Sequence, residues 1–149
     1  MRTRVPPNCR FEVDDFEDDW LFSRPFDFIH GRELEGSIRD HDRLFKQAFD
    51  NLKPQGYFEM QSIEVKFFSD DGTHLRATNC LSFNSMLRDA SERFGKSIHT
   101  VNTWEESMKK AGFKNVVSEV YKVCLFLEAN HPPNSNKQMT ELKSSPRFP

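Results

Sequence analysis

Two apolar segments separated by one helix-length of amphipathic sequence constrain the fold of this chain more than any other feature. Residues 26–30 have the pattern of a short buried strand that opens into a polar loop, and residues 56–61 that of a second strand after Lys53 and Pro54. Between them, apolar side chains recur at the spacing of one helical face: Leu44, Phe45, Ala48, Phe49 and Leu52. The pattern predicts a βαβ unit. Its polar loop lies at the carboxyl edge of a parallel sheet, which is where open α/β sheets bind ligands.

Length, charge and cysteine content limit the chain to one modest domain of a few functional classes. A length of 149 residues suits a single core, and a net charge of −2 with 30% charged residues offers no basic surface for nucleic acid. No apolar run is long enough to span a bilayer, and residues 5–8 contain two prolines where a signal peptide would need an apolar stretch. The three widely spaced cysteines predict neither a disulfide framework nor a zinc site. We therefore expect reduced thiols and a cytoplasmic or nuclear setting.

Strand-forming composition recurs on both sides of the βαβ unit. Residues 9–13 predict a strand that runs into the acidic stretch 14–19, and residues 116–127 predict one or two more strands. Residues 130–149 are polar and contain prolines, so we expect a partial domain over residues 1–129 followed by a disordered tail. Strands that alternate with helices indicate an α/β fold with a mainly parallel sheet.

Two further helices are expected between the later strands. The first has an apolar stripe within residues 83–94 and ends near Gly95. The second is expected to begin at a capping box, because Thr103 and Glu106 have the spacing at which each side chain satisfies a free backbone N–H. It is expected to end at Gly112, a residue type that readily adopts the left-handed cap conformation.

Several ordered motifs together resemble the middle of a class I S-adenosylmethionine-dependent methyltransferase. They are Asn8-Cys-Arg-Phe-Glu-Val-Asp-Asp15, Trp20, Phe26-Asp-Phe-Ile-His-Gly-Arg-Glu-Leu34 with Gly36-Ser37, and Leu52-Lys-Pro-Gln-Gly-Tyr-Phe-Glu-Met-Gln61. The group that the chain most resembles is the fungal LaeA-like group, which includes regulators of secondary metabolism and methyltransferases encoded in biosynthetic clusters. The resemblance implies a Rossmann-like sheet in the order 3-2-1-4-5-7-6, S-adenosylmethionine as cofactor, and a small-molecule or protein methyl acceptor.

Some parts of that family pattern have no counterpart in the sequence. Family members begin with a strand of the type V-L-D-x-G-x-G-x-G, whose glycines let the backbone approach the cofactor, and their second strand ends in an acidic residue that binds the ribose. The six glycines here are too far apart to form such a loop. We therefore expect a partial methyltransferase sheet that lacks the first two strands and the last one, with one wall of the cofactor site missing. An incomplete gene product is the simplest interpretation. Such a chain would be marginally stable alone, rearrange its strand pairing, or need a protein partner.

The resemblance assigns cofactor-binding roles to five residues. Asp15 stands where the family's acidic residue accepts a hydrogen bond from the adenine amino group, and Phe16 where a backbone N–H meets a ring nitrogen. His30, Gly31 and Arg32 stand at the end of the fourth strand, where the family's backbone flanks the cofactor's amino-acid portion and the substrate. His30 is also the one catalytic candidate, as a base. We prefer a role in which it donates to a backbone carbonyl and fixes the loop, because methyl transfer depends mainly on positioning.

Two classes of function follow. The first is a partial S-adenosylmethionine-dependent methyltransferase linked to fungal secondary metabolism. The second is a non-catalytic remnant or protein-interaction module, because LaeA-like regulators act in nuclear complexes. No metal site is expected: Asp40, His41 and Asp42 are adjacent at a helix start and point in different directions, so helix capping explains them better.

Overall fold

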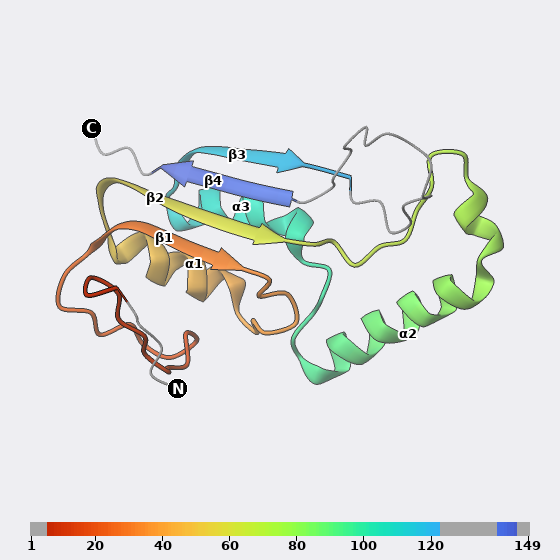
Figure 1. Ribbon diagram of the computed structural model, residues 1–149, viewed down its shortest axis with the longest axis horizontal. Helices are drawn as coiled ribbons and strands as arrows, with labels where there is room; N and C mark the ends of the chain where they lie inside the picture. The colour runs from red at the N-terminus through yellow and green to blue at the C-terminus, as the bar shows by residue number, and fades with distance from the viewer. Residues whose placement is uncertain (1–5, 123–139, 146–149) are drawn as a thin grey trace.

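The computed structural model describes residues 6–122 and the backbone of residues 140–145. Its elements are β1 (Phe26–Arg32), α1 (His41–Asp50), β2 (Leu52–Ser62), the 3-10 helix η1 (Thr73–Arg76), α2 (Thr78–Phe94), α3 (Val101–Ala111), β3 (Lys114–Val120) and β4 (Thr140–Ser145). Figure 1 shows α1 and α3 together on one face of the sheet, and α2 beyond the carboxyl ends of β1 and β2.

The sheet has the strand order β1-β2-β4-β3. β1 and β2 are parallel, whereas β4 lies between β2 and β3 and is antiparallel to both. This order matches the 4-5-7-6 half of the family order, so the expected absence of the closing strand is corrected. β1, β2 and β3 run in the same direction, as expected for a mainly parallel sheet, and the chain returns from β3 to insert β4 in the opposite direction (Figure 1).

β4 also changes the expected disordered tail, since residues 140–145 belong to the sheet. The rest of that segment, residues 130–139 and 146–149, lies outside the described residues, as do residues 123–127 of the expected second strand region. The domain boundary after residue 129 therefore stays a prediction.

The predicted βαβ unit is confirmed. Asp40 caps α1, because its side chain accepts a hydrogen bond of 2.9 Å from the backbone N–H of Arg43. β2 begins at Leu52, before the expected residue 56. The early start is accommodated by a local irregularity, in which Gln55 has a φ of 68° and the register of β1 shifts between Phe26 and Phe28.

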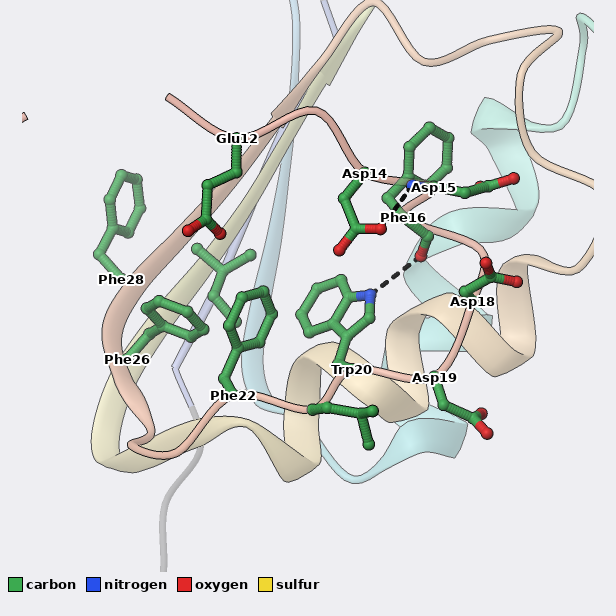
Figure 2. A pocket seen from close by; sticks show the side chains of 12 residues that line it. Glu12, Asp14, Asp15, Phe16, Asp18, Asp19, Trp20, Phe22, Phe26 and Phe28 are labelled. Atoms are coloured by element: carbon green, nitrogen blue, oxygen red, sulfur yellow. Dashed lines mark hydrogen bonds between the residues drawn. The ribbon is translucent and has the colours of Figure 1, made fainter. Parts of the chain in front are cut away.

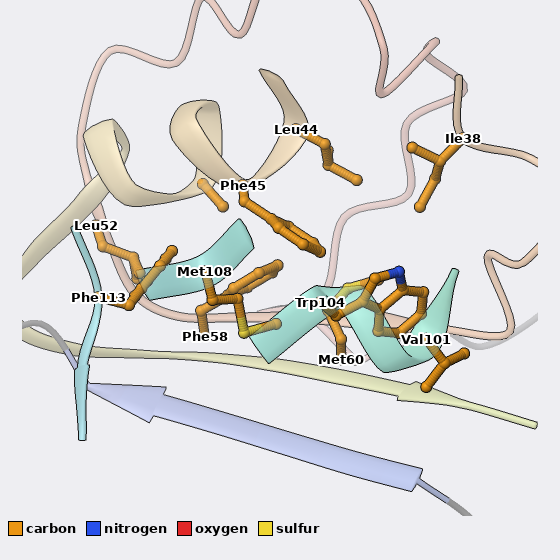
Figure 3. Close-up of a cluster of buried hydrophobic side chains, with 11 residues drawn as sticks. Ile38, Leu44, Phe45, Leu52, Phe58, Met60, Val101, Trp104, Met108 and Phe113 are labelled. Carbon is orange, nitrogen blue, oxygen red and sulfur yellow. The ribbon is translucent and has the colours of Figure 1, made fainter. Parts of the chain in front are cut away.

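One hydrophobic core lies between the sheet and the two helices that cover it. Its buried members are Ile38, Leu44, Phe45, Ala48, Leu52, Phe58, Met60, Val101, Trp104, Met108 and Phe113. Figure 3 shows these side chains converging from α1, α3 and β2. Phe45 meets Trp104 edge-on at 6.1 Å between ring centroids, and Phe58 stacks on Phe113 at 5.3 Å. These contacts fix the βαβ unit against α3.

The strand expected over residues 9–13 does not form. Phe11 and Val13 are 80% and 106% exposed, and the segment is irregular throughout. The segment pairs with no strand of the described sheet, in which β1 is the edge strand, so its backbone groups gain no ladder hydrogen bonds.

α3 begins earlier than its sequence suggested, so the capping-box prediction is wrong. The cap is Thr100, whose side chain makes no capping hydrogen bond, and Thr103 instead lies within the first turn and donates to the Thr100 carbonyl oxygen. The earlier start buries Val101 on the face that carries Trp104. The predicted end is confirmed, because Gly112 adopts a φ of 116°.

α2 forms as expected and ends at Gly95 in a left-handed conformation. None of its residues is buried, however, and its apolar stripe faces solvent in the described structure: Phe83, Met86 and Phe94 are 60–70% exposed. No helix among the described residues has the length and apolar character needed to cross a membrane.

Candidate functional site

The acidic segment before β1 is fastened to the domain by specific contacts. The Glu17 carboxylate accepts hydrogen bonds from the backbone N–H of Arg39 at 2.6 Å and from the Lys96 ammonium at 2.9 Å. Burial acts to raise the pKa of Glu17, but the Arg39 N–H and Lys96 outweigh it and hold the pKa below its ordinary value. Arg43 on α1 adds an ion pair to Asp19 at 2.7 Å. This part of the acidic stretch is therefore a loop anchored to α1 and to the segment after α2.

The anchored segment forms one wall of an open pocket of about 680 Å³, and β1 forms another. Its lining combines aromatic and acidic residues: Glu12, Asp14, Asp15, Phe16, Asp18, Asp19, Trp20, Leu21, Phe22, Phe26, Phe28 and Ile29. Figure 2 shows Trp20, Phe22 and Phe26 gathered on one side, with the carboxylates of Asp18 and Asp19 pointing away from the rings. The Phe22 ring meets Phe26 edge-on at 4.8 Å. An aromatic wall beside carboxylates suits a flat heterocycle that carries an amino group.

Two of the five expected cofactor residues, Asp15 and Phe16, lie in this pocket. The exposed Asp15 side chain accepts a hydrogen bond of 2.9 Å from the Glu17 N–H, which shapes the turn. The carbonyl oxygen of Phe16 accepts from the indole N–H of Trp20 at 2.9 Å. Trp20 in turn donates its backbone N–H to the Gln47 side chain on α1. The turn that carries Asp15 and Phe16 is thus attached to α1 through Trp20 and Gln47.

The other three expected residues, His30 to Arg32, end β1 but are not among the residues that line the pocket. The expected partner of His30 was a backbone carbonyl. The structure instead places its Nδ1 2.9 Å from the Glu59 carboxylate on β2. Arg32 is exposed and forms no ion pair with a carboxylate in the part of the chain that the structure describes. Glu59 was missed from the sequence, although it is the one charged residue in the expected strand 56–61.

Gly31 is required at its position by close packing. A Cβ atom there would lie 2.5 Å from Met60 Sδ and 3.1 Å from Leu34 Cδ1. Met60 is 1% exposed and belongs to the core, so it has little room to move away. The glycine therefore lets the end of β1 sit directly on a core side chain.

We expect Gly31→Ala to lower the free energy of unfolding by about 1–3 kcal/mol through overpacking. Urea denaturation of the two proteins measures the difference. The matched test is a double-mutant cycle with Met60→Ala, which removes the clashing sulfur. The cost of Gly31→Ala should shrink by about 1 kcal/mol or more in that background. Equal costs in both backgrounds would show that Met60 is not the obstacle.

Glu35, in the loop after β1, was also missed from the sequence. Both of its carboxylate oxygens are buried, and Thr100 and Val101, which act on them electrostatically, do not reach hydrogen-bond geometry in the described structure. Burial raises the pKa of Glu35 to about 7, although Thr100 and Val101 at the start of α3 act to lower it, and Glu33 raises it further. The sequence pattern around Glu35 does not predict that its carboxyl group is buried, because the burial depends on the start of α3 packing over the loop.

The three metal-capable residues at the start of α1 are directed to separate partners. Asp40 caps α1, Asp42 pairs with Lys110, and His41 Nε2 lies 3.0 Å from the Thr100 hydroxyl. Burial lowers the pKa of His41 below its ordinary value, so the ring is neutral near pH 7. Within residues 6–122, no three histidine, cysteine or acidic side chains are grouped to hold a metal ion.

Comparisons with known proteins agree on the family of the chain. A family model described as a methyltransferase domain matches residues 2–118. The methyltransferase pytC of Aspergillus terreus is 35% identical over 119 residues, which cover 80% of this chain and 37% of pytC. The probable methyltransferase tdiE of Emericella nidulans is 37% identical over 111 residues, covering 74% and 34%. The secondary metabolism regulator laeA of Aspergillus fumigatus is 25% identical over 114 residues, covering 74% and 30%.

Solved structures agree on the fold. A putative S-adenosylmethionine-dependent methyltransferase from Listeria monocytogenes superposes with a TM-score of 0.59 at 15% identity, covering 99% of this chain and 73% of that one. A methyltransferase from Thermotoga maritima, described as a possible histamine N-methyltransferase, gives 0.57 at 17% identity, covering 89% and 61%. The fold and the family match together define a Rossmann-like methyltransferase domain.

The chain belongs to the methyltransferase domain family of S-adenosylmethionine-dependent enzymes. It is more similar to the fungal methyltransferases pytC and tdiE than to the secondary metabolism regulator laeA. The chain spans about a third of the length of these relatives.

Proposed function

We propose that this chain forms one side of the cofactor site of an S-adenosylmethionine-dependent methyltransferase. The observation that carries the proposal is the pocket lined both by Asp15 and Phe16 and by the aromatic side chains of β1 and its approach. The chemistry of these groups fits an adenosine moiety, since the rings can cover a purine and the Asp15 carboxylate can accept from its amino group. His30, Gly31 and Arg32 at the end of β1 would adjoin the amino-acid end. When bound, the cofactor supplies an activated methyl group.

The similarity to the fungal methyltransferases pytC and tdiE, and to the secondary metabolism regulator laeA, supports a place for the protein in fungal secondary metabolism, with a small-molecule or protein methyl acceptor. A cytoplasmic or nuclear setting belongs to the same proposal and is consistent with exposed free cysteines at positions 9 and 80.

Isothermal titration calorimetry of the folded full chain with S-adenosylmethionine tests the proposal. We expect saturable heat that S-adenosylhomocysteine competes away. Asp15→Asn should weaken binding by about tenfold or more, because a hydrogen bond to a charged group contributes about 1.5–3 kcal/mol. Asp89→Asn on the exposed surface of α2 is the matched control and should bind as the parent does. A folded sample that gives no heat and no competition would rule out cofactor binding by this chain.

A second candidate, a protein-interaction module of a LaeA-like regulator, is favoured by a different observation. Phe28 and Tyr57 are paired across β1 and β2 and are 53% and 57% exposed. Their neighbours Ile29 and Phe58 pack in or against the core, so strand alternation places Phe28 and Tyr57 on the other face of the sheet. A photo-crosslinker at residue 57 should capture one defined nuclear protein from fungal extract, while the same group at Lys109 on α3 should not. Equal labelling from both positions would contradict this candidate.

A further inference from the structure

Lys96 joins three segments that are far apart in the sequence. Its ammonium group donates to the Glu17 carboxylate at 2.9 Å and to the carbonyl oxygen of Ser37, in the loop after β1, at 2.6 Å. The side chains of Lys96 and Glu17 are only 21% and 19% exposed. Water and salt therefore screen this pair less than an exposed ion pair, and removing one partner would leave the other charge partly buried without compensation.

The end of α2 fixes the backbone of Lys96. Gly95 caps the helix in a left-handed conformation with a φ of 78°, and the Lys96 N–H donates to the Ser91 carbonyl oxygen at 3.1 Å. The side chain therefore starts from a defined point and spans from there to the acidic segment and to the loop after β1. The helix end and two acceptors together hold the ammonium group in place.

Glu17 passes this constraint on to the turn that carries Asp15. The Glu17 side chain is held by Lys96 and by the Arg39 N–H, while its backbone N–H donates to Asp15 Oδ1 at 2.9 Å. The Asp18 N–H closes the same turn on the Asp15 carbonyl oxygen at 3.0 Å. Asp15 Oδ2 accepts no hydrogen bond from the residues that the structure describes, so it is available to a ligand. A displacement of Glu17 would therefore move the Asp15 carboxylate.

We infer that Lys96 is a positioning residue of the cofactor site, which acts through Glu17 to place the Asp15 carboxylate for the amino group of an adenosine ligand. This inference rests on the proposed function, which supplies the ligand. Lys96 itself does not line the pocket. Its contribution is to hold the turn before the ligand arrives, so that binding does not have to order it. Arginine at this position would keep the charge and the donors, whereas methionine would keep only the apolar part of the side chain.

The ¹⁹F NMR spectrum of the full chain labelled with 5-fluorotryptophan tests this role without cofactor. The chain has two tryptophans: Trp20 lies in the anchored segment, and Trp104 lies in the core and serves as the internal reference. Lys96→Met should shift or broaden the Trp20 signal and leave the Trp104 signal unchanged. Lys96→Arg should retain the parent spectrum. Lys109→Met, which breaks an exposed ion pair with Glu105 on α3, is the matched control and should retain it as well.

Isothermal titration calorimetry with S-adenosylhomocysteine measures the consequence for binding. Lys96→Met should weaken binding about five- to tenfold, and Lys96→Arg about twofold or less. In the Asp15→Asn background the effect of Lys96→Met should fall to about twofold or less, because Lys96 acts through Asp15. An unchanged Trp20 signal in Lys96→Met, or an equal loss of affinity in the two backgrounds, would overturn the inference.

The two measurements separate this inference from the proposed function. A parent chain that binds no S-adenosylhomocysteine would overturn the proposed function, whereas the ¹⁹F spectra would still show whether Lys96 holds the turn. Binding by the parent that Lys96→Met leaves unchanged would overturn only the assignment of Lys96.

Discussion

Trp104→Ala is expected to lower the free energy of unfolding by about 3–5 kcal/mol, which is a large share of the roughly 5–15 kcal/mol that holds a domain together. Trp104 is fully buried at the centre of the core, where its ring meets Phe45 edge-on and lies 5.8 Å from the His41 ring. Its indole N–H donates to the Thr100 hydroxyl at 3.1 Å. Alanine would leave a cavity bordered by α1 and α3 and would remove the donor that ties Trp104 to Thr100, the N-cap of α3.

Two further variants show how much of the stability lost in Trp104→Ala comes from lost packing and how much from the lost hydrogen bond. Trp104→Phe keeps most of the apolar volume but loses the hydrogen bond, so its cost should be smaller than that of alanine. Phe94→Ala removes an aromatic ring that is 70% exposed on α2 and should change stability by about 0.5 kcal/mol or less. Chemical denaturation followed by circular dichroism compares all three. A Trp104→Ala protein no less stable than the Phe94→Ala protein would contradict the position of the core.

The βαβ unit and the methyltransferase family were predictable because they depend on local pattern. The stripe from Leu44 to Ala48 is buried as its period required, and the Gly95 and Gly112 helix ends are in the predicted positions. These features need only a few consecutive residues, since a helical face or a left-handed cap is specified by near neighbours along the chain.

Features that depend on distant partners were not predictable. β4 is a polar strand with a sequence typical of a tail, and it is recognisable only once β2 and β3 present free edges on either side. Residues 9–13 have a strand-like composition but stay irregular, because composition does not supply a neighbouring strand.

The same distinction applies to the site. Asp15 and His30 were proposed from their motif positions, whereas the environments of Glu59 and Glu35 depend on what folds against them. Motif order therefore predicted candidate site residues, but it did not show which buried carboxyl groups lie near the end of β1 and in the loop after it.

Glu35→Gln is expected to stabilise the protein above neutral pH and to leave it unchanged in acid. The folded-state pKa of Glu35 is raised from 4.5 to about 7, mainly by burial. Below pH 4.5 the carboxyl group is protonated in both the folded and the unfolded chain and costs nothing. Between pH 4.5 and 7 the unfolded chain releases the proton while the folded chain retains it, so the stability of the parent falls as pH rises. The amide of glutamine has nearly the same shape and never ionises.

The expected gain from Glu35→Gln at pH 8 is about 1–2 kcal/mol. Stability curves from urea denaturation at pH 4.5, 6 and 8 measure the difference between variant and parent at each pH. Comparing the two at equal pH cancels the titration of Glu17 and Asp42, whose carboxylates are stabilised by the fold and whose contribution falls in acid. Glu64→Gln, at an exposed position, is the matched control and should show no such trend.

A gain in stability that is equal at pH 4.5 and pH 8 would mean that the charge of Glu35 is not what destabilises the parent. A gain that grows across this range shows that the loop after β1 carries a carboxylate whose ionisation the start of α3 does not fully compensate.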